Sequence, residues 1–327
     1  MTFPTTSRPA RPRGVRRWAG AGVVPLAAAL VLTGCAGDGQ RPVSDDTSEP
    51  TRTASPESPG SPEPAQEPTT DPSSEPTEAT ESTSSPGGTV VPLYFAGDGP
   101  GGTALFREFR RVDGDPLTEA ARIIAGGGEP GDPDYRTLWP QVEIASVQAT
   151  DGVLYVEIPD DGFTERPDGM SKRDARLALQ QLVYTLQGVQ QERTPVVIGR
   201  PDTVPRLFGL ATGGMVSDAS PLKTLNHVNI TAPAEGDTIT RDFITVSGVA
   251  NSFEASGPCR LLQDGTELAM VPYQLDEWAT DKLFPFQVDI PLDGVSGEVV
   301  VQCETDDPSG GAEGNGPAID TKTITVE

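Results

Sequence analysis

A long stretch near the N-terminus has too few apolar residues to form a hydrophobic core. Residues 36–88 contain 10 Pro, 18 Ser or Thr and 11 acidic residues, and Val43 is their only large apolar side chain. Such a segment cannot bury enough apolar surface to offset the entropy lost on folding, and its prolines and like charges keep it extended. We therefore expect residues 35–88 to form a disordered tether. The folded structure is then confined to residues 89–327.

The residues before the tether have the pattern of an export signal. Residues 1–34 hold five arginines and no acidic residue, and an apolar run extends from Ala19 to Leu32. A basic start followed by a short apolar core is typical of a secretory signal peptide. The run ends in Leu32-Thr33-Gly34-Cys35, which resembles the lipobox of bacterial lipoproteins. The resemblance implies lipidation of Cys35 and an extracytoplasmic protein anchored in the cell membrane. A plain signal peptide with an incidental cysteine is the alternative.

Residues 89–216 combine strand and helix patterns. Asp115-Pro116 provides an N-cap followed by proline at the first helical position, and Ser171 with Asp174 opens a longer apolar stripe. Asp151-Gly152 indicates the turn of a hairpin. The expected strands are 90–95, 104–110, 142–148, 153–158 and 194–199. This order predicts an α+β domain in which two helices pack on one small mixed sheet.

Residues 226–327 contain short strand patterns and no helical stripe. Turn signals such as Asp264-Gly265 separate several of the strands. About a hundred residues of this kind predict an immunoglobulin-like β-sandwich. The expected strands are 228–231, 243–249, 259–263, 286–290, 298–304 and 319–326.

Two of the three cysteines are candidates for a disulfide, and the third is assigned to lipid attachment. Cys259 and Cys303 fall on inward-facing positions of predicted strands, and Cys35 is assigned to lipid. In an exported chain the buried pair is expected to form a disulfide. In the chain-entropy model this bond stabilises the folded domain by about 4 kcal/mol. Two free buried thiols are the alternative.

The folded part also resembles two known domains. The segments 91–95, 105–112 and 175–189 resemble the GerMN domain of sporulation and germination proteins. The segments 230–236, 244–250 and 253–255 resemble the immunoglobulin-like domain that accompanies GerMN in bacterial lipoproteins. The resemblance implies an envelope interaction protein, and it supplies no catalytic residues.

Charge and motif content argue against several other functions. Lys and Arg number 24 and Asp and Glu number 48, so the net charge of −24 would repel nucleic acid. Residues 97–102 match G-x-G-x-x-G, but a strand rather than a helix is expected next, so a turn is favoured. Ser220-Pro221-Leu222-Lys223 matches S-x-x-K without the other motifs of that enzyme class. His227 is the only histidine and is expected at a surface or hinge.

Acidic residues leave two further possibilities. Asp160-Asp161 and Asp276-Glu277 are candidate pairs for a wall hydrolase, although solvated acidic loops are favoured because few aromatic residues are present to bind a sugar. A third group could bind calcium through oxygen atoms, but its spacing misses the EF-hand pattern. It comprises Asp306, Asp307, Glu313 and Asn315.

We expect a non-enzymatic, lipid-anchored envelope protein that needs no catalytic residue, cofactor or metal. Its expected partners are the membrane, through the lipid, and other envelope proteins or further copies of itself. Binding to peptidoglycan or another wall glycan is the second hypothesis, with Trp139, Tyr273 and Trp278 as exposed sugar contacts. Packing of these rings in the core is the alternative for them, and a wall hydrolase is a remote third function.

Overall fold

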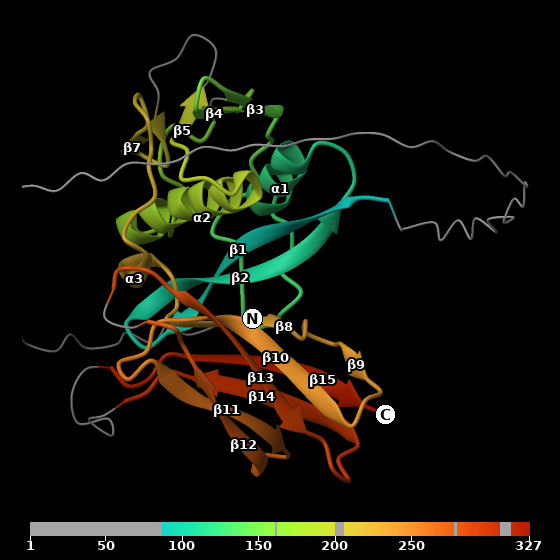
Figure 1. The fold of residues 1–327 in the computed structure, drawn as a ribbon. Helices are drawn as coiled ribbons and strands as arrows, with labels where there is room; N and C mark the ends of the chain where they lie inside the picture. The colour runs from blue at the N-terminus through green and yellow to red at the C-terminus, as the bar shows by residue number, and fades with distance from the viewer. Residues whose placement is uncertain (1–86, 161, 200–205, 278–279, 308–314) are drawn as a thin grey trace, which may run out of the picture. The chain divides into compact units, whose positions relative to one another are not determined.

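The described part of the chain consists mainly of β-strands, with three helices (Figure 1). The computed structural model describes residues 87–160, 162–199, 206–277, 280–307 and 315–327. The expected signal peptide, Cys35 and nearly all of the expected tether lie outside these residues. None of the described helices combines the length and the apolar character needed to cross a membrane. We refer to residues 87–225 as the mixed part and to residues 226–327 as the β part.

The mixed part contains all three helices. Its elements in chain order are β1 (Thr89–Gly99), β2 (Gly102–Val112), α1 (Pro116–Ala125), β3 (Ser146–Thr150), β4 (Val153–Glu157), α2 (Lys172–Gln190), β5 (Val196–Gly199), β6 (Arg206–Leu207), β7 (Leu210–Ala211) and α3 (Pro221–Thr224).

Both long helices begin where the sequence indicates. The Asp115 side chain accepts a hydrogen bond from the Thr118 amide at 2.8 Å, which caps α1. Ser171 and Asp174 form a reciprocal capping box at the start of α2. One face of α2 then lies in the core, where burial of residues such as Leu182 stabilises the fold by about 1.5–3 kcal/mol each.

The mixed part forms more than one sheet, so the prediction of a single sheet under both helices was wrong. Strands β3, β4 and β5 form a three-stranded sheet with one antiparallel and one parallel pair. Strands β1 and β2 form a separate hairpin, which α1 and α2 contact through β1. No third strand joins β1 among the described residues, because its outer edge is bonded elsewhere: the Tyr94 amide donates to Thr185 Oγ1, and Ala96 exchanges two bonds with Arg136.

The β part forms two sheets that enclose one hydrophobic core, in agreement with the expected sandwich. One sheet has the order β13-β10-β8, and the other has the order β12-β11-β14-β15-β9. The elements are β8 (Val228–Ala232), β9 (Thr238–Ile239), β10 (Phe243–Ala250), β11 (Ser256–Gln263), β12 (Thr266–Gln274), β13 (Phe284–Pro291), β14 (Gly297–Glu304) and β15 (Ile319–Val326).

Cys259 and Cys303 form the expected disulfide. The two residues are direct partners on neighbouring strands β11 and β14, and both are fully buried. The bond therefore joins two strands of one sheet rather than the two sheets of the sandwich.

Strand β12 was absent from the prediction. It lies at the edge of its sheet, exposes Leu268 and Met270, and contains Pro272. Proline lacks the amide that a central strand requires, so a sequence pattern containing it argues against a strand, although an edge strand tolerates it.

Candidate functional site

The mixed part and the β part meet at a buried cluster of four polar side chains. Lys322 Nζ donates to Asp132 Oδ2 at 2.5 Å and to the Tyr135 hydroxyl at 2.7 Å, and it lies 3.6 Å from Asp320 Oδ1. The Tyr135 hydroxyl has one proton, which it donates to Asp320 Oδ1 at 2.5 Å. We call these four residues the junction cluster.

Local structure accounts for each member of the cluster. Asp320 and Lys322 alternate along β15 and share its buried face with Ile324 and Val326, which lie in the β-part core. Asp132 and Tyr135 come from the loop between α1 and β3. The first half of the inward face of β15 is thus charged, and it contacts the mixed part.

Both side-chain oxygen atoms of Asp320 accept a hydrogen bond from a backbone amide as well. Its Oδ2 accepts from the Ile230 amide at 2.6 Å, and its Oδ1 accepts from the Thr321 amide at 3.0 Å. The acid therefore joins two β-part strands as well as the two parts.

Electrostatics keep Lys322 charged and Tyr135 protonated. Burial lowers the pKa of Lys322, but the nearby carboxylates of Asp320 and Asp132 outweigh it and raise that pKa overall. Burial, followed by the negative charge of Asp320, raises the pKa of the Tyr135 hydroxyl well above its usual value. All four side chains are almost inaccessible to solvent. The cluster is therefore suited to fastening the two parts together.

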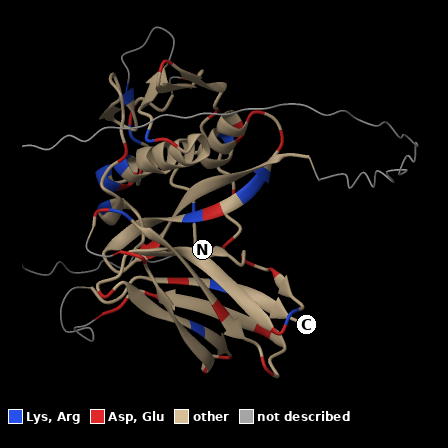
Figure 2. Cartoon of the chain, viewed as in Figure 1, with Lys and Arg blue, Asp and Glu red and all other residues tan. Residues whose placement is uncertain are grey.

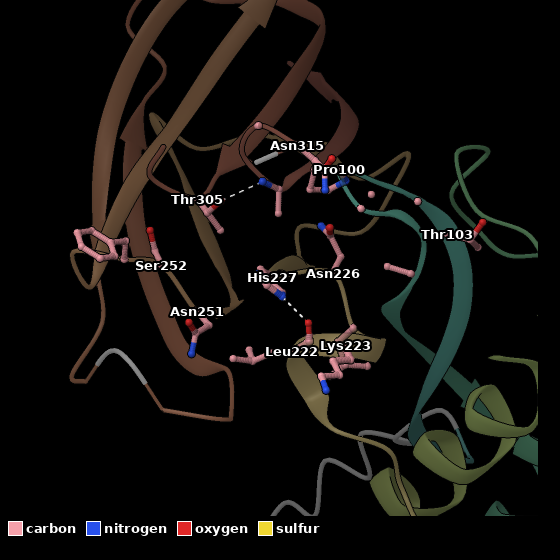
Figure 3. Close-up of a pocket in the computed structure, with 18 of the residues that line it drawn as sticks. Pro100, Thr103, Leu222, Lys223, Asn226, His227, Asn251, Ser252, Thr305 and Asn315 are labelled. Carbon is pink, nitrogen blue, oxygen red and sulfur yellow. Dashed lines mark hydrogen bonds between the residues drawn. The ribbon is translucent and has the colours of Figure 1, made fainter. Parts of the chain in front are cut away.

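A cavity of about 550 Å³ lies between the β1–β2 turn and the β part (Figure 3). Its wall includes Asn226, His227, Asn251, Ser252 and Thr305. These side chains are amides, hydroxyls and one imidazole. Polar uncharged groups therefore form much of the wall.

The structure places the G-x-G-x-x-G motif in a hairpin turn and the S-x-x-K motif at a short helix. Residues 97–102 form the end of the β1–β2 hairpin, as the turn interpretation predicted. Ser220 precedes the short helix α3, and its side chain makes no capping bond. His227 is half-buried, with Nε2 2.8 Å from the Leu222 carbonyl oxygen. Residues of both motifs, and His227, nevertheless line the cavity.

Two of the three aromatic residues proposed as exposed sugar contacts are buried, so that assignment was wrong for them. Trp139 is 3% exposed and its indole donates to the Ala178 carbonyl, while Tyr273 is 1% exposed and its hydroxyl donates to the Glu304 carbonyl. Both rings pack in hydrophobic cores, as the alternative interpretation held. Trp278 lies outside the described residues.

The candidate acidic residues are exposed or partly exposed where the structure describes them. Asp160 accepts a bond from the Gly162 amide in an exposed loop, and Asp276 and Glu277 are exposed. Asp161 lies outside the described residues, as does Glu313 of the calcium hypothesis. Within the described ranges, no three His, Cys, Asp or Glu side chains are grouped so that they could hold a metal.

Comparisons with known proteins assign both parts. Residues 92–199 match the family model described as sporulation and spore germination, and residues 227–312 match that of the immunoglobulin-like domain of bacterial spore germination. Residues 92–199 are a GerMN-type domain, and residues 227–312 are a germination-type immunoglobulin-like domain. A comparison with curated proteins gives no significant match.

Two solved structures are also similar to the chain, both at low TM-score. The tandem GerMN domains of the sporulation protein GerM from Bacillus subtilis align with a TM-score of 0.32 and 14% identity, over 62% of this chain and 60% of that one. A "Putative Lipoprotein from Clostridium perfringens" aligns with a TM-score of 0.26 and 16% identity, over 40% of this chain and 88% of that one. The chain thus spans less than two thirds of the tandem-domain structure.

The sequence analysis did not identify the junction cluster that connects the GerMN-type domain to β15. A signal was present, because Asp320 and Lys322 occupy the same alternate positions as Ile324 and Val326. Charged residues at inward positions of a strand indicate a buried polar contact.

Proposed function

We propose that this chain is a lipid-anchored envelope protein whose GerMN-type and immunoglobulin-like domains serve as non-enzymatic interaction modules. In this proposal Cys35 carries the lipid, residues 35–88 are the tether, and the domains extend over residues 89–216 and 226–327. The matches to two germination-type families support an envelope role, and neither family description refers to catalysis.

The junction cluster is the observation that carries the interaction role. Lys322 and Asp132 form an ion pair between the two domains in which both side chains are at most 3% exposed. Removing either partner would leave a buried uncompensated charge, so separation of the domains is costly. Two domains held in this way keep their outer surfaces in a fixed orientation. A module that binds other envelope proteins or further copies of itself requires such an orientation.

Cross-linking in cells tests the interaction role. A photo-reactive amino acid is placed at Phe109 on β2 or at Met270 on β12, which are exposed side chains in different domains. The expected result is one dominant cross-linked protein, either another envelope protein or a second copy of the chain, from at least one position. The same substitution at the buried residue Leu182 is the control and should give no such product. Diffuse, low-yield products from both exposed positions would contradict the proposal.

Fractionation tests the anchor separately. Cys35→Ala should move the protein from the membrane fraction to the medium, because the thiol is required for lipid attachment. Gly39→Ala, which lies beyond the lipobox, should leave the protein in the membrane fraction. Membrane retention of Cys35→Ala would show that the anchor has been assigned to the wrong residue.

A wall hydrolase requires a different result. Release of sugars or peptides from wall material by the full chain, abolished by Asp160→Ala, would replace the non-enzymatic proposal. We expect no such release, because Asp160 lies in an exposed loop where its carboxylate is solvated.

A further inference from the structure

The cavity in Figure 3 contains an acceptor atom that lacks a donor. Asn226 is 2% exposed, and its Nδ2 donates to the carbonyl oxygens of Val228 at 2.8 Å and Ile319 at 3.0 Å. These two bonds fix the orientation of the amide, so the other end is Oδ1. Within the described residues, Oδ1 is buried and has no hydrogen-bond partner. A buried acceptor without a donor costs about 1–3 kcal/mol, which a ligand hydroxyl or amide N–H would recover.

Two neighbouring side chains on the wall also offer acceptors. His227 Nε2 lies 2.8 Å from the Leu222 carbonyl oxygen, and a carbonyl only accepts, so Nε2 carries the proton. In the neutral ring Nδ1 is then an acceptor. Asn251 Nδ2 donates to the carbonyls of Thr280 and Lys282, which leaves its Oδ1 as the acceptor end. A ligand with several donors matches this wall.

The charges around the cavity oppose one another. Arg173 and Lys223 contribute positive charge to the lining and Asp306 contributes negative charge. Arg173 donates to the carbonyls of Gly101 and Thr103 at 3.3 Å, so it holds the β1–β2 turn. Asp and Glu residues are otherwise spread over both domains (Figure 2). Because Arg173 is held by the carbonyls of the turn, Lys223 and Asp306 are the remaining charges of the lining, one of each sign, and an uncharged ligand suits it best.

An exposed aromatic ring completes the wall. Phe253 lines the cavity and is 57% exposed, directly after the buried Ser252. An exposed ring beside hydroxyl and amide groups provides an apolar face and directed hydrogen bonds in one site.

We propose that this cavity binds a neutral saccharide. A sugar supplies hydroxyl donors for Asn226 Oδ1, His227 Nδ1 and Asn251 Oδ1, and its C–H face can pack on Phe253. The volume of about 550 Å³ lies within the range of small-molecule sites. This site uses none of the aromatic residues that the sequence suggested for glycan binding.

The test uses the full chain in a zwitterionic detergent that has no sugar headgroup. Chitotriose, cellotriose and maltotriose are the probes, and binding is measured by calorimetry and by saturation-transfer NMR. At least one trisaccharide should bind the wild type with a dissociation constant in the range of about 0.01–1 mM.

Two variants locate the site. Gly101 has ordinary negative φ, and the nearest atom to an added Cβ is Asn315 Nδ2 at 3.9 Å, so Gly101→Leu places a side chain in the cavity without strain. Phe253→Ala removes the ring. Each variant should weaken binding by at least about tenfold while thermal unfolding stays unchanged. Phe243→Ala removes an exposed ring elsewhere, on β10, and should bind as the wild type does.

Three results would overturn the proposal. The first is no binding of any trisaccharide at about 10 mM. The second is unchanged binding by both variants, which would place the sugar elsewhere. The third is that inorganic phosphate binds more tightly than every trisaccharide and that Gly101→Leu abolishes this binding. That result would show that the cavity binds anions. None of these results affects the cross-linking outcome, so the two proposals fail independently.

Discussion

The junction cluster makes Lys322→Met the most informative substitution in this chain. Methionine is similar in length to lysine but has no charge and donates no hydrogen bond. In the wild type, Nζ bonds Asp132 and Tyr135 and ion-pairs Asp320, and these side chains are almost fully buried. The substitution leaves the carboxylates of Asp132 and Asp320 buried without the cation that compensates their charge.

The expected loss of stability follows from that burial. Breaking a buried ion pair by removing one partner costs about 3–5 kcal/mol, because the remaining charge stays desolvated. We expect the free energy of unfolding to fall by about this amount. The free energy of unfolding of a native domain is about 5–15 kcal/mol in total, so the expected loss is a large fraction of it.

Urea denaturation of the full chain, followed by circular dichroism, measures the change. Lys223→Met is the matched control, because Lys223 is exposed, and it should stay within about 0.5 kcal/mol of the wild type. The double variant Lys322→Met with Asp132→Asn should recover part of the loss, since it removes one of the two uncompensated charges. A single-variant loss below about 1 kcal/mol, or a double variant no more stable than the single one, would refute the reasoning.

Three further predictions rest on other features. The pKa values of Lys322 and Tyr135 are higher in the folded protein than in the unfolded chain, where they lie near pH 10. The stability that these shifts contribute is therefore complete below about pH 10 and is lost as the pH rises further. Thermal unfolding measured from pH 8 to pH 11.5 should show this decline, and the midpoint should fall less steeply with pH in Tyr135→Phe. Gly248→Ala should destabilise by about 1–3 kcal/mol in urea titrations, because the added Cβ would collide with the Asn229 carbonyl oxygen and lie 2.8 Å from the Phe286 ring. Gly214→Ala is the matched control, because an added Cβ there meets nothing within 4 Å and Gly214 is not among the glycines with positive φ. Reducing the Cys259–Cys303 bond, which closes a separation of 44 residues, should cost about 4 kcal/mol in unfolding free energy, and an unchanged midpoint would contradict it.

Local signals predicted the parts of the fold that depend on neighbouring residues. The caps at Asp115 and Ser171 formed, and Asp151-Gly152 adopts positive φ at both residues, as its hairpin requires. The inward positions of Cys259 and Cys303 followed from period-two alternation and proved correct.

The sequence was less informative where distant segments meet. Nothing near Tyr94 indicates that its amide bonds a threonine on α2, which is why one sheet was expected and the separate β1–β2 sheet was not. The exposure of Trp139 and Tyr273 was misjudged because of packing that no local pattern shows. Trp139 packs against Phe208, far along the chain, and Tyr273 packs against Phe286 of the other sheet of the sandwich. The cavity joins the β1–β2 turn to residues more than a hundred positions later, and no local pattern could have predicted it.

The position of the disulfide has a mechanical consequence. Because the bond joins adjacent strands of one sheet, it leaves the two sheets free to separate under tension, but it keeps the segment between the cysteines closed. A chain pulled from both ends would therefore release about 150 Å less length when oxidised than when reduced, for 44 residues at about 3.4 Å each. The bond thus limits how far the protein can be stretched without setting the force at which its sandwich opens.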